Sequence, residues 1–356
     1  MKIEGALSFI SDNIRALKGY HLTPEETEIK LNQNENPQDW PLEIKKQAAQ
    51  FCIERPWNRY PNFIPEDLKA DLARYTGVKP SNVIVGNGSN EVLLVLLLSF
   101  LSKASAAIIC SPTFTVYKLL SEGMGSRNVN ISLTDDLQYD TEAIQKAVRE
   151  NPGSLLIICS PNNPVGNDIS EEQLRSILDQ HSGICILDQA YVEFGGFNGI
   201  KLISEYPNLI VTRTFSKAMG AAGLRIGYMI GAEEMISEIN KIKLPYNINF
   251  FTEYTASLLL KNRTHLSSSV AAMIKERDKL YSGFKSFPFD NVYDSKANFI
   301  LVRYSEKQKL FDFLKKEGIL VRDVSSYPLL ENCLRISVGK SEENRRLLNC
   351  LKSFFG

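Results

Sequence analysis

The sequence predicts an α/β protein. Its large domain has a mostly parallel sheet flanked by helices, and a smaller α+β domain is built from the C-terminal part and the N-terminal segment. Between residues 83 and 231, short apolar runs alternate with segments of helical spacing, as in βαβ units. The run Leu155–Cys159 is apolar throughout, which is typical of a parallel strand covered on both faces. Beyond about residue 250 this alternation stops. We expect a large domain over residues 41–250 and a small C-terminal domain over residues 251–356. Residues 1–40 are expected to form an N-terminal segment that joins the small domain.

Length and composition fit this organisation and narrow the function. The chain has 356 residues, of which 44% are hydrophobic and 23% charged, as in soluble globular proteins. A formal net charge of zero gives no basic field for nucleic acid. The N-terminus lacks the apolar region of a signal peptide, and the apolar run Val92–Leu101 is too short to span a bilayer. We therefore expect a cytoplasmic protein without membrane or nucleic-acid partners.

Cysteine and histidine usage predicts neither disulfides nor a metal site. The six cysteines form no C-x-x-C pair, and several lie in or beside apolar strand-like runs, where buried free thiols are expected. The three histidines lack the spacing of metal ligands.

The first half of the chain contains the following expected elements. Residues 1–30 read as a helix followed by a polar loop. Ser170 and Gln173 have the spacing of a capping box at the start of a helix. Further helices are expected over Pro65–Tyr75 and Val92–Leu101, and strands over Val83–Gly86, Ala106–Cys110, Leu155–Cys159, Ile184–Asp188 and Leu209–Thr212.

The C-terminal part is expected to contain one long helix and a small group of strands. The apolar spacing predicts a single helical segment over Thr252–Phe284. The elements after it are a strand over Ala297–Arg303, a helix over Glu306–Glu317, and strands over Ile319–Val324 and Cys333–Gly339.

A lysine in a glycine-rich turn is the central chemical feature. Lys217 follows the strand Leu209–Thr212, and small residues that let a ligand approach the backbone come after it. Ser216 and Arg225 flank the lysine. This combination suits a phosphorylated aldehyde, since the amine would form an imine while Ser216 and Arg225 would hold the phosphate. A tight turn with a solvated lysine and arginine is the alternative.

A second phosphate-binding feature follows the strand Val83–Gly86. Gly88, Ser89 and Asn90 open a helix, and the N–H groups at a helix N-terminus bind phosphate. The alternative is that Ser89 or Asn90 is only the N-cap of the helix, which would account for the same residues.

Asp188 ends a buried strand, where a carboxylate is costly unless a cation pairs with it. A capping aspartate is the alternative. Ser89, Asn163, Asp188 and Lys217 all follow strands, and ligands of open α/β sheets bind beyond the carboxyl ends of strands. These four residues are therefore expected to share one site.

The Lys217 segment resembles the cofactor-binding lysine motif of pyridoxal-phosphate enzymes with the aspartate aminotransferase fold, fold type I. The resemblance runs from about Tyr20 to the C-terminus and is greatest to histidinol-phosphate aminotransferases. It implies that Lys217 carries pyridoxal 5′-phosphate and acts as the general base. It further implies that Asp188 keeps the ring nitrogen protonated, while Tyr191 and Asn163 bind the 3-oxygen.

The resemblance also implies which groups hold the rest of the cofactor. Thr214 would join Ser216, Arg225 and the Ser89–Asn90 amides at the phosphate. Tyr60 would reach the phosphate of the neighbouring subunit, which implies a homodimer with shared active sites; alone, it reads as a surface tyrosine before a proline.

Three positions depart from the family pattern. Phe114 stands where the family usually has a tyrosine stacked on the pyridine ring of the cofactor. The alternative is that Phe114 belongs to the hydrophobic core. Val165 and Gln189 replace the usual threonine and glutamate.

Two arginines point to the substrate. Arg335 lies inside an apolar strand and needs an anion, and Arg322 matches a second anion-binding arginine of the family. Internal salt bridges are the alternative for both. The resemblance adds Tyr20 and Asn36 near the substrate.

The resemblance implies transamination between L-histidinol phosphate and 2-oxoglutarate in histidine biosynthesis. Its small-molecule substrates are thus an amine and a 2-oxo acid. The alternatives are an aromatic or broad-specificity aminotransferase, a threonine-phosphate decarboxylase, and a non-catalytic binding protein of the same fold.

Overall fold

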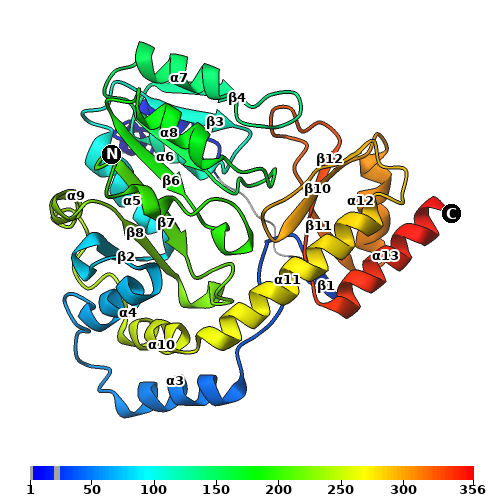
Figure 1. The fold of residues 1–356 in the computed structure, drawn as a ribbon, viewed down its shortest axis with the longest axis horizontal. Helices are drawn as coiled ribbons and strands as arrows, with labels where there is room; N and C mark the ends of the chain where they lie inside the picture. Colours follow the sequence, from blue (N-terminus) through cyan, green and yellow to red (C-terminus); the bar gives the residue numbers. More distant parts are fainter. Residues whose placement is uncertain (1–2, 20–24) are drawn as a thin grey trace.

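Two β-sheets with their own helices divide the molecule into a larger and a smaller part (Figure 1). The computed structural model describes residues 3–19 and 25–356. In the larger sheet β8 runs antiparallel to both of its neighbours, whereas the other pairs are parallel, so the predicted α/β class is confirmed. The strand order is β2 (Val83–Asn87), β8 (Ile226–Ile230), β7 (Leu209–Thr214), β6 (Ile184–Asp188), β5 (Leu155–Cys159), β3 (Ala107–Ser111) and β4 (Asn128–Ser132).

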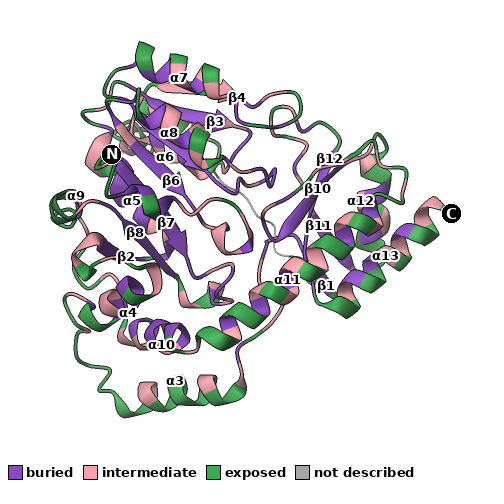
Figure 2. Ribbon diagram, in the orientation of Figure 1, coloured by how far each residue is buried: buried purple, intermediate pink, exposed green. Residues whose placement is uncertain are grey.

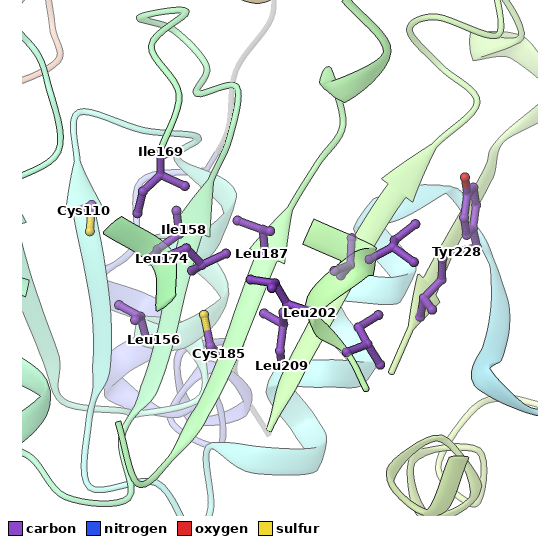
Figure 3. Close-up of a cluster of buried hydrophobic side chains, with 14 of the residues drawn as sticks. Cys110, Leu156, Ile158, Ile169, Leu174, Cys185, Leu187, Leu202, Leu209 and Tyr228 are labelled. Carbon is purple, nitrogen blue, oxygen red and sulfur yellow. The ribbon is translucent and has the colours of Figure 1, made fainter. Parts of the chain in front are cut away.

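Apart from the edge strand β4, the larger sheet is buried on both faces because its strands are apolar at successive positions (Figure 2). In β5, Leu156 and Ile158 pack on one face, whereas Leu155, Ile157 and Cys159 pack on the other. Figure 3 shows part of the first cluster, where Leu174 reaches the sheet from its helix. Helices α4 (Glu66–Thr76), α7 (Thr141–Glu150), α8 (Glu171–Leu178) and α10 (Phe250–Lys261) cover this face, and α5 (Gly88–Phe100), α6 (Val116–Gly123) and α9 (Glu233–Ile239) cover the other.

The smaller sheet combines segments from both ends of the chain. β1, from the N-terminal region, pairs in parallel with β11 near the C-terminus. The strand order is β1 (Ile29–Leu31), β11 (Ile319–Asp323), β12 (Cys333–Ser337), β10 (Phe299–Arg303) and β9 (Asn291–Val292). Helices α11 (Arg263–Phe284), α12 (Lys307–Lys316) and α13 (Ser341–Phe355) pack on one face of it.

Strand alternation turns two arginines away from these helices. Leu334 and Ile336 of β12 lie in the core beside α13, so Arg335 between them points to the opposite face. Arg322 of β11 lies directly across from Arg335 in the antiparallel register. The two guanidinium groups therefore face the larger part of the molecule.

The remaining helices lie outside these layers. Helix α3 (Leu42–Glu54) packs on α10 and is largely exposed (Figure 2). The other elements are α1 (Ile3–Leu7), α2 (Asp12–Ala16) and the short 3₁₀ helices η1 (Pro80–Asn82), η2 (Val192–Phe194), η3 (Gly199–Leu202) and η4 (Ala222–Leu224). Among the described residues, no helix combines the length and apolar character needed to cross a membrane.

Two predictions of secondary structure were wrong. The single helix predicted over Thr252–Phe284 is divided at Asn262, whose backbone is non-helical and whose side chain donates to the carbonyl of Leu258 at 2.8 Å. Such local hydrogen bonds let asparagine compete with helix continuation. Within residues 3–19 and 25–31, the structure contains two short helices and the edge strand β1, instead of one helix and a loop.

Candidate active site

A cavity of about 360 Å³ lies at the carboxyl ends of the parallel strands, with residues of both sheets in its lining. This is where ligands bind in open α/β sheets. Twelve of the residues predicted from the sequence line it: Ser89, Asn90, Phe114, Asn163, Asp188, Tyr191, Thr214, Ser216, Lys217, Arg225, Arg322 and Arg335.

Lys217 lies just beyond β7, and its Nζ donates to the carbonyl of Gln33 at 2.9 Å. The cavity leaves part of this side chain accessible, but the surrounding protein desolvates the amine. This burial, together with the nearby positive charge of Arg335, lowers the pKa of Lys217 to about 7. A neutral amine is nucleophilic, so Lys217 can react with an aldehyde near neutral pH.

A cluster of polar groups suited to a phosphate lies next to Lys217. The Ser216 hydroxyl lies 3.1 Å from the Thr214 hydroxyl and accepts a hydrogen bond from Arg225 at 3.2 Å. The start of α5 completes the cluster, since the first N–H groups of a helix lack intrahelical partners. Asn87 holds the cap position, so Ser89 and Asn90 lie in the first turn and are not the cap.

Glycine at position 227 permits the close contact between β8 and the start of α5. A Cβ atom at Gly227 would lie 2.2 Å from the backbone nitrogen of Ser89. Gly88 itself has a φ of 79°, a conformation that favours glycine. The two glycines therefore permit the start of α5 to approach β8 and Arg225 closely.

Asp188 is a buried carboxylate at the end of β6, with 3% of its surface exposed. Its Oδ2 accepts a hydrogen bond from Tyr117 Oη at 2.6 Å, and its Oδ1 accepts one from the Ala190 amide at 3.1 Å. Burial raises the pKa of Asp188, although these hydrogen bonds oppose the rise. Among the described residues, no lysine or arginine forms an ion pair with Asp188. A cationic ligand would therefore compensate the negative charge of this buried carboxylate.

Tyr191 and Asn34 connect the larger sheet to the smaller one. The amide of Asn34 donates to Tyr191 Oη at 3.1 Å, and Ser337 Oγ of β12 donates to Asn34 Oδ1 at 2.8 Å. Sequence reasoning missed Asn34 and Tyr117. Asn34 stands two residues before the predicted Asn36, and only its φ of 55° and its burial distinguish it.

Asn163 contacts Arg335 directly. One guanidinium nitrogen of Arg335 donates to Asn163 Oδ1, and another donates to the carbonyl of Asn32 at 2.7 Å. The guanidinium also lies 5.3 Å from the centre of the Phe299 ring. Within the described part of the chain, Arg322 forms no ion pair, so the predicted alternative of an internal salt bridge is not observed for it.

Two residues predicted for the site, Asn36 and Tyr60, do not line the cavity of this chain. Asn36 is outside the cavity lining, because its amide donates to the carbonyl of Ala218 and to Ser269 Oγ, both at 3.1 Å. Tyr60 is 80% exposed and stacks on Tyr246. Tyr20 lies outside the described residues.

The residues in the cavity fit pyridoxal 5′-phosphate, with an aldehyde-reactive lysine, a phosphate cluster and a buried carboxylate for a ring cation. The sequence matches the model of the aminotransferase class I and II family over residues 26–351, and the chain belongs to this family. It is a pyridoxal-phosphate-dependent aminotransferase with the type I fold.

Within this family, the chain is similar to histidinol-phosphate aminotransferase from Chlorobaculum tepidum. The two are 38% identical over 92% of this chain and 94% of that protein. A crystal structure of histidinol-phosphate aminotransferase from Sinorhizobium meliloti in complex with pyridoxal 5′-phosphate shares the fold, with a TM-score of 0.85, 24% identity and 98% coverage of both chains.

The fold by itself does not select the reaction. The L-threonine-O-3-phosphate decarboxylase from Porphyromonas gingivalis shares it with a TM-score of 0.78 at 20% identity, over 92% of this chain and 99% of that one. The substrate must therefore be argued from the side chains of the cavity.

Proposed function

We propose that this enzyme transfers the amino group of L-histidinol phosphate to 2-oxoglutarate, a step of histidine biosynthesis. The main support is the cross-strand pair of Arg322 and Arg335, which both line the cavity. Two guanidinium groups on one wall suit a dianionic phosphate better than a single carboxylate. In the second half of the reaction, Arg335 would bind a carboxylate of 2-oxoglutarate.

The roles of the cavity residues follow from their positions. When bound, pyridoxal 5′-phosphate supplies an electron sink for the substrate carbon. Thr214, Ser216, Arg225 and the start of α5 would hold its phosphate. Phe114 would cover one face of its ring.

Proton transfer is assigned to Lys217. With a pKa of about 7, its amine can accept a proton from the substrate carbon and return it near neutral pH. Asp188 would hold the ring nitrogen, while Tyr191 and Asn163 would orient the 3-oxygen. These proposed roles would bring a base, an anion site and a cation partner together in one cavity.

The active site is further proposed to be shared between two copies of the chain. Tyr60 is 80% exposed and its neighbours Trp57 and Phe63 are 74% and 59% exposed. Apolar side chains gathered in this way mark protein interfaces. A partner molecule docked here would receive Tyr60 at its cofactor phosphate.

A cytoplasmic location completes the proposal. The six cysteines are free, and four of them are buried, as expected in a reducing compartment.

Steady-state kinetics test the proposed substrate. The kcat/KM for L-histidinol phosphate with 2-oxoglutarate should exceed the values for phenylalanine and tyrosine by about a hundredfold or more, since only the phosphate engages both arginines. Preference for the aromatic amino acids would assign the enzyme to that class. Release of CO₂ from threonine phosphate would identify a decarboxylase.

A further inference from the structure

Tyr117 is a fully buried residue whose hydroxyl reaches the carboxylate of Asp188. It lies in the first turn of α6 and has 0% of its surface exposed. Its Oη lies 2.6 Å from Asp188 Oδ2. An apolar residue of similar shape would fill the same space, so the hydroxyl needs a separate explanation.

One short segment supplies both Tyr117 and the ring-covering Phe114. The two residues are three positions apart, and their rings meet edge to face with centroids 5.6 Å apart. The segment from the end of β3 to the first turn of α6 therefore places an aromatic ring at the cavity and a hydrogen-bond donor beside Asp188.

The hydrogen bonds of Asp188 leave room for a ligand. Tyr117 and the Ala190 amide each donate to one of its two oxygens, and the Thr212 side chain is a further polar contact. An ionised carboxylate can accept about four. Burial raises the pKa of Asp188, and the Tyr117 hydroxyl is the first among the contacts that lower it.

We propose that Tyr117 is a positioning residue that keeps Asp188 ionised and correctly oriented, so that the shared proton stays on the ring nitrogen of the bound cofactor. Without the phenol donor, the carboxylate would become more basic, and this proton would move from the ring nitrogen to Asp188. The inference rests on the proposed pairing of Asp188 with that nitrogen.

The test uses the holoenzyme loaded with pyridoxal 5′-phosphate labelled with ¹⁵N in the ring. The ¹⁵N chemical shift distinguishes a protonated from an unprotonated ring nitrogen. In Tyr117→Phe, the shift should move towards the unprotonated value, and kcat should fall roughly 10- to 100-fold, the range for loss of a hydrogen bond to a charged group.

Tyr139→Phe is the matched control. Tyr139 is also buried, at 4% exposure, but its hydroxyl donates to the backbone carbonyl of Cys159. Tyr139→Phe removes a phenol oxygen, as Tyr117→Phe does, but this oxygen does not contact Asp188. The ¹⁵N shift should therefore remain that of the wild type. An equal change in both variants would show a general structural effect and overturn the proposal.

The variant Asp188→Asn distinguishes a failure of the role of Tyr117 from a failure of the proposed pairing between Asp188 and the ring nitrogen. A wild-type ¹⁵N shift in Asp188→Asn would mean that the pairing of Asp188 is wrong. A changed shift in Asp188→Asn but not in Tyr117→Phe would overturn the role of Tyr117 alone.

A crystal structure of the wild-type holoenzyme provides a readout that does not depend on the folding of a variant. The hydrogen bond between Tyr117 Oη and Asp188 should persist when the cofactor is bound. A structure in which the hydroxyl has left Asp188 would overturn the proposal.

Discussion

Lys217 is an ionisable amine that the fold holds largely uncharged at pH values above about 7. The strand β7 positions it, and desolvation with a contribution from Arg335 makes its protonation costly. The sequence indicated the lysine from its small and polar neighbours. Its pKa depends on groups from the smaller sheet, which no local pattern reveals.

Lys217→Met should therefore stabilise the cofactor-free protein in a pH-dependent way. The pKa of Lys217 is about 7 in the fold, against 10.5 for the unperturbed amine. Between these values the unfolded chain binds more protons, so the stability of the wild type rises with pH. The variant lacks this penalty, so its advantage should be a few kcal/mol at pH 6 and vanish near pH 10.5. Urea unfolding at both pH values measures it, and a pH-independent difference would contradict the burial of the amine.

Arg322→Ala should distinguish the two substrates. Losing one charge-assisted contact to phosphate should raise KM for L-histidinol phosphate by about 10- to 100-fold. The KM for glutamate, with Arg335 retained, should change less. Arg322→Lys keeps the charge without the planar fork and should recover only part of the loss. Equal effects on both substrates would argue against phosphate recognition by Arg322.

At the scale of elements, the phosphate space depends on the packing of β8 against the start of α5. The turn after β7 was predicted from its small residues, and the glycine at the start of α5 from the Gly-Ser-Asn letters. The role of Gly227 was not predictable, because it depends on a contact with Ser89, which lies far from it in sequence. The proposed phosphate site thus depends on strand pairing as well as on a local motif.

Gly227→Ala should weaken cofactor binding. The added Cβ would lie 2.2 Å from the Ser89 nitrogen, so the start of α5 must move. Overpacking of this kind typically costs about 1–3 kcal/mol, and cofactor affinity should fall about 2- to 12-fold if half of that appears in binding. The control is Gly231→Ala, where the new Cβ would meet its neighbours at 3.5 Å or more. Titration of both apoproteins with pyridoxal 5′-phosphate provides the comparison, and wild-type affinity in Gly227→Ala would contradict the account.

At the scale of the whole molecule, the cavity is assembled from two sheets and from both ends of the chain. The α/β class and most strands could be predicted, because apolar runs determine buried strands. The N-terminal strand β1 could not, since its three residues gain stability by pairing with β11. Asn34 and Tyr117 were missed for the same reason, as their partners lie 157 and 71 residues away in sequence.

A shared active site predicts complementation between two inactive or weakened variants. Tyr60→Phe and Lys217→Ala would each damage every site of their own dimers. A mixed dimer contains one site with both native residues, so an equal mixture should regain about a quarter of wild-type activity. Activity is measured after unfolding and refolding the mixture, with each variant alone as the control. Full activity of a monomer in sedimentation would rule out the shared site.

The most direct test of the central claim is to locate the cofactor on the chain before and after substrate. Borohydride reduction followed by peptide mass mapping should find the pyridoxyl group on Lys217, and addition of L-histidinol phosphate before reduction should remove that label. Attachment at another lysine, or a label on Lys217 that L-histidinol phosphate leaves unchanged, would contradict the account.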